Sequence, residues 1–262
     1  MRRFTIMPIA VLAGCFLAAS AKASEWGDLK ATFIYDGTAF KAKSLKITSD
    51  VEYCSKHAPK DESLVVNPDN HGIANVIAYL YLRRSAPKPP VHPSYRQTAE
   101  AKVLLDNKQC RFDPHVVLLR TTQTLVMHNS DDVSHNTKVD TFVNPAINFT
   151  IPVHRKMEHQ FPRAERLPAR VSCSIHPWMT GWVVIKDNPY MGSSDKDGQL
   201  LIKNIPIGTW TFQFWHERAG YVREVKQNGE TKQWKRGRIE ITIQPGVNDL
   251  GEVRLAPSLF KD

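Results

Sequence analysis

A short segment in the second half of the chain carries three side chains that can bind a metal ion. The stretch Val171–Ile185 reads V-S-C-S-I-H-P-W-M-T-G-W-V-V-I, with a thiol at Cys173, an imidazole at His176 and a thioether at Met179. Residues with a high strand propensity lie on both sides of these donors. The spacing therefore predicts a metal-binding loop between two strands.

The donor atoms of this loop indicate which metal it would bind. Cysteine and methionine sulfurs are soft ligands, and a trigonal His₂Cys set with a long axial Met is typical of an electron-transfer copper centre. Structural zinc prefers Cys-rich or Cys/His sets without thioethers, so Met179 favours copper. A lone Cys-x2-His pattern is common by chance, since many buried cysteines are small core residues. The turn formers Pro177 and Gly181 strengthen the metal interpretation.

A His₂Cys set requires a second histidine, and the best candidate lies upstream in T-L-V-M-H-N-S-D-D-V-S-H-N-T-K-V-D. Residues 129–132 are rich in turn formers, so His135 is expected where a new strand begins. His128 is the rival, but it falls inside the preceding strand pattern. Asn136 follows His135 and carries an amide, which could supply the hydrogen bond that a copper thiolate sulfur needs from its surroundings.

The quoted loop resembles the ligand loop of amicyanin-type cupredoxins, matching C-x2-H-P-x-M-x-G-x-V-V in its spacing and in its Pro and Gly. The segment F-D-P-H-V-V-L-L-R-T-T-Q-T-L-V-M-H-N-S-D-D-V-S-H-N is similar to the strand, polar turn and His-Asn pair of that family. This resemblance covers residues 103–186, about a third of the chain. It implies one type 1 copper site and a Greek-key β-sandwich, with the ligands His135, Cys173, His176 and Met179.

The same resemblance implies where a redox partner would dock. In cupredoxins the C-terminal ligand histidine emerges through an apolar patch, so His176 is expected at the docking surface with Pro177 and Trp178 beside it. A small apolar patch suits the brief encounters of redox proteins. The long N-terminal extension and a C-terminal domain depart from the family pattern, so no particular partner is carried over.

The N-terminus predicts export. Residues 1–24 combine a basic start, the apolar run I-M-P-I-A-V-L-A-G-C-F-L-A-A and a small-residue A-K-A site, which is typical of a secretory signal rather than a membrane-spanning helix. The alternative is the lipoprotein-like box L-A-G-C, where cleavage would leave a lipid anchor on Cys15. The apolar run continues past Cys15, which favours the ordinary site. We expect a periplasmic or otherwise exported protein with no membrane span after signal removal.

The remaining cysteines indicate a disulfide. Cys54 and Cys110 are left once the signal and the metal loop are set aside, and in an oxidising compartment such a pair is expected to be bonded. Closing that loop contributes about 4 kcal/mol in the chain-entropy model. The alternative is a second metal site that adds His57 and His115 to the two cysteines. Two further histidines, His154 and His159, lie in an irregular Pro-rich segment and are expected to be ordinary loop residues.

The amount and distribution of charge do not indicate a nucleic-acid partner. Removing the signal takes away Arg2, Arg3 and Lys22 but no acid, so the formal charge falls from +9 to +6. The basic residues are scattered except in K-Q-W-K-R-G-R at residues 232–238, and no nucleic-acid motif accompanies that cluster. We interpret it as a solvated hairpin or a contact for an acidic partner.

The rest of the chain reads as strands, which predicts an all-β protein. Several strand patterns lie between residues 26 and 105, and we expect them to extend the copper sandwich, because a half-sandwich would leave an apolar face uncovered. This gives a copper domain over residues 25–186, followed by a second small sandwich over 187–258. The second domain resembles carboxypeptidase-regulatory or transthyretin-like modules. Its residues Trp210, Phe212 and Phe214 share one face at period two and are expected in its core. His216 and Glu217 end that strand and are expected in a plain loop.

These expectations converge on an exported blue copper protein that shuttles single electrons between redox proteins. One alternative is a periplasmic copper carrier or storage protein, because the same soft ligands bind Cu(I) for delivery. Another is a structural binding module whose metal site is incidental. An enzyme is not expected, because neither a second copper site nor a catalytic acid-base pair is evident.

Overall fold

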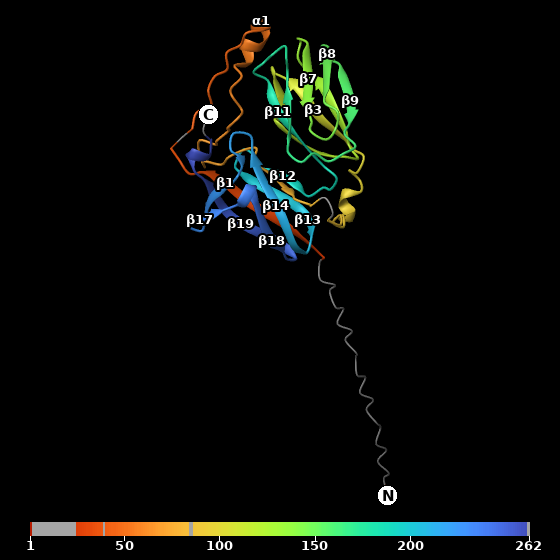
Figure 1. Cartoon of the computed structure of the whole chain (residues 1–262), viewed down its shortest axis with the longest axis vertical. Coiled ribbons are helices and arrows are strands. Elements are labelled where there is room, and N and C mark those ends of the chain that lie inside the picture. Colours follow the sequence, from red (N-terminus) through yellow and green to blue (C-terminus); the bar gives the residue numbers. More distant parts are fainter. Residues whose placement is uncertain (2–24, 39, 84–85, 261–262) are drawn as a thin grey trace.

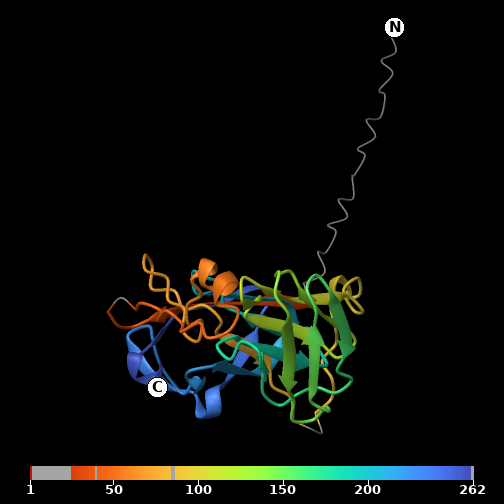
Figure 2. The ribbon, with the colours of Figure 1, turned by 90° about the horizontal axis from the view of Figure 1, so that it is seen from above.

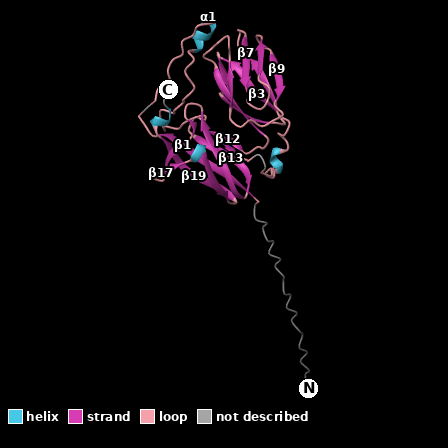
Figure 3. Cartoon of the chain, in the orientation of Figure 1, coloured by secondary structure: helices cyan, strands magenta, loops and turns pink. Residues whose placement is uncertain are grey.

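The computed structural model describes residues 1, 25–38, 40–83 and 86–260, and almost all of its regular elements are strands (Figure 3). The all-β prediction is therefore confirmed. The predicted signal segment and Cys15 lie outside the described residues. Within the described ranges, no helix has both the length and the apolar character needed to cross a membrane.

One β-sandwich is formed by the middle of the chain. Its first sheet has the strand order β4-β3-β6-β9 and its second has the order β5-β11-β10-β7-β8. The strands alternate inward and outward residues, and the inward ones fill a shared core that includes Leu105, Val171 and Val183. The strands are β3 (Lys102–Lys108), β4 (Arg111–Asp113), β5 (Val116–Arg120), β6 (Thr124–Asn129), β7 (His135–Asp140), β8 (Ile147–Ile151), β9 (Lys156–Gln160), β10 (Ala169–Ser172) and β11 (Thr180–Lys186).

A second sandwich contains the C-terminal strands together with two strands from the N-terminal part. One sheet has the order β13-β1-β19-β16-β17, and the other has the order β12-β2-β14-β15 with β18 beside β14. The strands are β1 (Trp26–Tyr35), β2 (Ile77–Leu80), β12 (Met191–Ser193), β13 (Gln199–Pro206), β14 (Gly208–His216), β15 (Gly220–Tyr221), β16 (Glu224–Gln227), β17 (Glu230–Gln233), β18 (Arg238–Ile243) and β19 (Gly246–Leu255).

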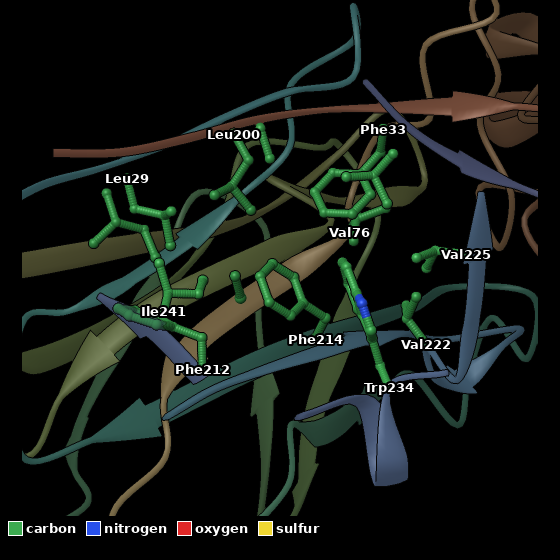
Figure 4. Close-up of a cluster of buried hydrophobic side chains, with 14 of the residues drawn as sticks. Leu29, Phe33, Val76, Leu200, Phe212, Phe214, Val222, Val225, Trp234 and Ile241 are labelled. Carbon is green, nitrogen blue, oxygen red and sulfur yellow. The ribbon is translucent and has the colours of Figure 1, made fainter. Parts of the chain in front are cut away.

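The core of this second sandwich confirms the period-two pattern of β14. Phe212 and Phe214 are fully buried, and Trp210 is partly buried against the same cluster. Figure 4 shows Phe33 of β1 and Val76 among these side chains, beside Trp234. The basic cluster at residues 232–238 ends the β16–β17 hairpin and runs through a short 3-10 helix, η3 (Lys235–Gly237).

The prediction that the N-terminal strands extend the copper sandwich is wrong for β1 and β2. β1 pairs with β13 on one side and with β19 on the other, and β2 pairs with β12 and β14. In Figure 1 the red β1 lies among the blue strands of the C-terminal part. The physical reason is that the inward residues of β1, including Leu29 and Phe33, fill the second core. Without β1, the facing edges of β13 and β19 would lack hydrogen-bond partners.

The two sandwiches pack against one another (Figure 2). Val184 and Tyr79 are buried at their junction, where Trp182 meets Trp215 edge to face with ring centroids 4.6 Å apart. The Lys186 ammonium lies 3.6 Å from the centre of the Tyr79 ring. The end of β11, which follows the predicted metal loop, is therefore anchored on the second sandwich.

The segment between β1 and β2 leaves the second sandwich and returns to it. It carries the helix α1 (Val51–Cys54) and the 3-10 helix η1 (Ser55–His57), and Figure 1 shows α1 at the end of the first sandwich, far from β1. The predicted disulfide between Cys54 and Cys110 is confirmed, and it ties this segment to the turn between β3 and β4. The remaining helices are η2 (Pro93–Tyr95) and η4 (Pro257–Phe260).

Candidate metal centre

The predicted metal loop joins β10 to β11. These strands pair antiparallel with Ser172 opposite Thr180, so the residues that follow β10 and precede β11 lie side by side. The backbone N–H of Cys173 donates to the carbonyl of Met179 over 3.3 Å, and the N–H of Met179 donates to the carbonyl of His176 over 2.8 Å. These bonds close residues 173–179 into a compact turn.

Strand pairing also brings His135 to this loop. β7 pairs antiparallel with β10, with Lys138 opposite Ser172, so the first residues of β7 reach Cys173. The ligand atoms of His135, Cys173 and His176 all lie within 4.8 Å of one another. The two imidazole rings are 4.5 Å apart between centroids. The three predicted trigonal donors are thus brought together from sites far apart in the sequence.

All the predicted ligands are buried. Cys173 is 2% exposed, Met179 is 1% exposed and both histidines are 0% exposed. Met179 belongs to the same buried cluster as Cys173. Water is largely excluded from a donor group this deeply buried, so the electrostatic interactions within the group are stronger than at the surface.

The Cys173 sulfur accepts two backbone hydrogen bonds. The N–H groups of Asn136 and His176 each lie 3.4 Å from Sγ. Asn136 therefore reaches the sulfur through its backbone N–H, and its side-chain oxygen also lies 3.4 Å from Sγ, where it accepts from the thiol when Cys173 is protonated. The same oxygen accepts the N–H groups of Ser174 and Ile175, over 2.6 and 3.3 Å, and so fixes the start of the loop.

This environment favours the thiolate, the form of cysteine that binds metals. Burial raises the pKa of Cys173, but the neighbouring His135 and His176 imidazoles and the two backbone N–H groups outweigh it and lower the pKa to about 6. The sulfur therefore carries negative charge at neutral pH, before any metal is bound.

His135 is held by a carboxylate that the sequence analysis did not single out. Its Nε2 lies 2.9 Å from Oδ2 of Asp131, and the Asp131 carboxylate also accepts the backbone N–H groups of Gln109 and Cys110. Burial raises the pKa of Asp131, but the hydrogen bonds from His135 and these N–H groups outweigh it, so the pKa is lowered. An ionised Asp131 can only accept, so the Nε2 of His135 must carry the proton.

The other nitrogen of His135 is the clearest sign of a ligand. Nδ1 is buried and has no hydrogen-bond partner within the part of the chain that the structure describes. Buried polar atoms are rarely left unpaired without a reason. With Nε2 protonated, Nδ1 is a free acceptor beside the Cys173 thiolate, which is the form in which imidazole binds a metal ion.

His176 has a matching arrangement. Its Nε2 lies 2.8 Å from Oδ2 of Asp50, and its Nδ1 lies 3.8 Å from the Cys173 sulfur. Carboxylates that hold the far nitrogen of a ligand histidine are a general feature of metal sites. Two Nδ1 atoms and one thiolate thus face a common point, so the donor set fits a single copper ion.

The expectation that His176 reaches the surface is wrong, whereas docking of a partner at Pro177 and Trp178 stays a prediction. Its side chain has no exposed area, and Asp50 lies against the Nε2 edge of the ring. Pro177 is exposed, while Trp178 is half-buried and its Nε1 donates to the carbonyl of Cys110 over 3.1 Å. Trp178 lies edge to face on the His176 ring, so its indole packs against the donor group.

The rival histidines have other partners. His128 lies in β6 with Nδ1 3.0 Å from an Asp106 oxygen, and the exposed His154 pairs with Asp132 at 3.1 Å. His159 is half-buried, with its ring edge to face on Phe161. The alternative second site using Cys54 and Cys110 is excluded, because the two sulfurs are bonded to one another. Cys110 also lies near Asp131 and His135, but as a disulfide it offers no thiolate.

The strand end at His216 and Glu217 belongs to the junction of the sandwiches and not to a plain loop. Glu217 accepts from the Trp182 indole and lies 2.8 Å from Nε2 of His115. His216 is completely buried, and burial lowers its pKa to about 4, so it is neutral at physiological pH.

Of the carboxylates missed in the sequence, one had a local signal. Asp131 stands four residues before His135 in a polar turn, a spacing that allows its side chain to turn back onto the ring. Asp50 lies 126 residues before His176 and reaches it only through the excursion that carries α1, so nothing in its surroundings marks it.

Fold and site together define an all-β protein with a buried His₂Cys donor group beside a methionine. No family model matches the chain, and no curated protein matches it. Solved structures that resemble parts of it include a novel purple cupredoxin from Nitrosopumilus maritimus, at 22% identity over 33% of this chain and 100% of that chain, with a TM-score of 0.28.

Two further solved structures also resemble parts of the chain. A reduced mutant of amicyanin is 17% identical over 42% of this chain and 98% of that chain, with a TM-score of 0.30. A Cu-containing nitrite reductase from Thermus scotoductus SA-01 is 16% identical over 40% of this chain and 25% of that chain, with a TM-score of 0.29. The choice of metal rests on the donor atoms described above.

Proposed function

We propose that this chain is an exported type 1 copper protein that shuttles single electrons between redox proteins. The observation that carries the proposal is the orphaned Nδ1 of His135, which lies with a buried thiolate and a second carboxylate-held imidazole. His135, Cys173, His176 and Met179 would hold the copper ion, which would supply one-electron chemistry between its +1 and +2 states, with the Met179 thioether as a weak donor that tunes the potential.

The residues of this chain would keep the centre rigid during that cycle. The ligand side chains are packed in the core, and each trigonal donor is fixed by hydrogen bonds from outside the group. Donors that cannot rearrange impose nearly the same geometry on both oxidation states, so little reorganisation accompanies each transfer.

The same features favour electron transfer over a copper carrier and over a copper enzyme. A carrier must release its metal, whereas two histidines held by carboxylates and a buried thiolate oppose release. A catalytic copper needs an open position for substrate, whereas these donors are almost completely covered. We therefore propose a non-enzymatic role with redox proteins as partners, and an exported location on the basis of the N-terminal segment.

Copper reconstitution of matched variants tests this proposal. Cys173→Ala should abolish the intense visible charge-transfer band and the reversible one-electron couple, because the thiolate produces both. His128→Ala removes the rival histidine in the neighbouring strand and should leave both unchanged. Retention of the band in Cys173→Ala, or a colourless Cu(I) site that passes its metal to an acceptor, would exclude the electron-transfer role.

A further inference from the structure

The segment Asp50–Cys54 lies over the metal centre and is attached to it at three points. Asp50 bonds to His176 at 2.8 Å, the Tyr53 hydroxyl donates to Oδ1 of Asp131 over 3.1 Å, and Cys54 is bonded to Cys110. We call residues 50–54 the cover.

The attachments serve both histidines of the donor group. Asp50 contacts His176 directly, while Tyr53 contacts the carboxylate that holds His135. The backbone N–H of Cys110, the residue disulfide-bonded to the cover, donates to the other oxygen of that carboxylate over 2.8 Å. The cover therefore touches each histidine or its carboxylate holder, and a displacement of the cover would loosen both.

Exposure shows that this segment separates the centre from solvent. The His176 side chain is 0% exposed, whereas the Asp50 side chain above it is 41% exposed. Val51 of α1 is 52% exposed and Cys54 is 0% exposed, so the segment presents one face to water and one to the site. Asp50 also adopts a left-handed backbone conformation, with φ 44° and ψ 44°, which persists only where the surrounding contacts fix it.

The cover does not belong to the sandwich that it closes. Its chain comes from β1 and returns to β2, both in the second sandwich, and reaches the first sandwich between these two strands. Within the described residues of the excursion, the regular structure consists of α1, η1 and isolated bridges. Its position at the metal end thus depends on side-chain contacts with the first sandwich rather than on a sheet; these contacts include the three attachments, the packing of Ile47 against the core and the ion pair of Glu62 with Arg111.

We propose that residues 50–54 form a cover that controls access to the metal centre, with Asp50 as a positioning residue that fixes the imidazole of His176. Asp50 holds the Nε2–H tautomer, so that Nδ1 faces the Cys173 sulfur. The closed cover shields the thiolate from solutes. The inference rests on the proposed function only in naming copper as the metal.

The reactivity of Cys173 in the metal-free protein tests the shielding. In a background where Cys15 is replaced by Ser, Cys173 is the one unbonded cysteine of the chain. Losing a hydrogen bond to a charged group corresponds to roughly a tenfold to hundredfold change in an opening equilibrium. We expect Asp50→Ala to raise the rate of Cys173 modification by an aromatic disulfide reagent about tenfold or more, and Cys54→Ser/Cys110→Ser to raise it further.

Glu52→Ala is the matched control, because its exposed side chain lies in α1 and should leave the rate at the wild-type value. Equal rates in wild type and Asp50→Ala would overturn the cover. Circular dichroism checks the fold of the double serine variant, and Asp50→Ala keeps the test decisive if that variant does not fold.

The ¹⁵N shifts of the His176 ring in the same metal-free samples test the positioning role. Asp50→Asn retains an acceptor oxygen and should keep the Nε2–H tautomer, whereas Asp50→Ala should give a mixture. A wild-type tautomer in Asp50→Ala would overturn the role of Asp50. Neither measurement uses copper, so the two proposals can be contradicted independently. The cover proposal can be overturned while a type 1 spectrum is observed, and the spectrum can be absent while the cover behaves as expected.

Discussion

Each histidine of the donor group is held by a carboxylate on the nitrogen that faces away from Cys173. For His135 this is Asp131, whose negative charge is secured by several N–H donors. Such a carboxylate fixes the ring and raises the basicity of the nitrogen that binds the metal. The carboxylate partner therefore determines which nitrogen of the ring is available to a metal. This choice depends on single residues rather than on the fold.

We predict that Asp131→Ala lowers the affinity for copper by about 10- to 100-fold, because the ring loses its orientation and the proton on Nε2 is no longer fixed. Competition with a chelator measures this change. Asp132→Ala is the control, since Asp132 is exposed and its side chain pairs with the exposed His154. Equal affinities for the two variants would contradict the role of Asp131.

At the scale of elements, the metal loop is positioned by β11, which fits tightly against the turn before β5. A Cβ on Gly181 would lie 3.0 Å from the carbonyl oxygen of His115 and 3.4 Å from Cβ of Phe112. That carbonyl accepts the N–H of Trp182 over 2.8 Å, so it cannot move away without losing a hydrogen bond. A glycine here lets β11 and the loop before it reach the core.

We predict that Gly181→Val destabilises the protein by about 1–3 kcal/mol, the usual effect of inserting atoms into a packed interior. Urea unfolding of the metal-free protein measures the free energy. Thr180→Val places the same side chain one residue earlier on β11, where Thr already has a branched Cβ, and should change stability by less. An unchanged unfolding free energy in Gly181→Val would show that the strand is loosely packed.

The metal loop was predictable because its evidence is local. Three donors, two turn formers and the flanking strands fall within Val171–Ile185, and His135 begins a recognisable strand upstream of it. The alternation of β14 likewise identified its core residues. The place of β1 was not predictable in this way, because an alternating strand fits either sandwich and its partner β19 lies at the opposite end of the chain.

At the scale of the whole molecule, the two sandwiches are joined by a buried polar contact as well as by aromatic packing. Glu217 of the second sandwich binds His115 of the first at 2.8 Å. Burial lowers the pKa of His115, but the hydrogen bond and charge of Glu217, with the charge of Glu62, outweigh it, so the pKa is raised above its ordinary value. The junction therefore contains an ion pair whose contribution to stability depends on pH.

The sign of this dependence follows from linkage. Because the folded-state pKa of His115 is raised, the pair stabilises the protein fully below the unfolded pKa of about 6.5, and the stabilisation is lost as pH rises through the folded value. We predict that Glu217→Gln lowers the free energy of unfolding by about 1–3 kcal/mol at pH 6 and by less at pH 9. Unfolding at both pH values, with the exposed Glu240→Gln as control, measures the difference. A loss that does not vary with pH would show that the pair is not charged.

The excursion that carries α1 is a second link between the two sandwiches. It also explains the burial of His176, which sequence patterns could not predict. The resemblance to cupredoxins implied an exposed His176, whereas the chain outside the matched segment covers it with Asp50. A contact made by a residue 126 positions away, in a segment outside both sandwiches, leaves no trace in the spacing of a loop.

The most direct test of the central claim is X-ray absorption at the copper edge of the reconstituted protein. The account predicts one short copper–sulfur bond from Cys173 and two imidazole nitrogens, from His135 and His176, with Met179 as a longer and weaker sulfur contact. A copper ion without a short sulfur bond, or one bound by more than two imidazoles, would contradict it.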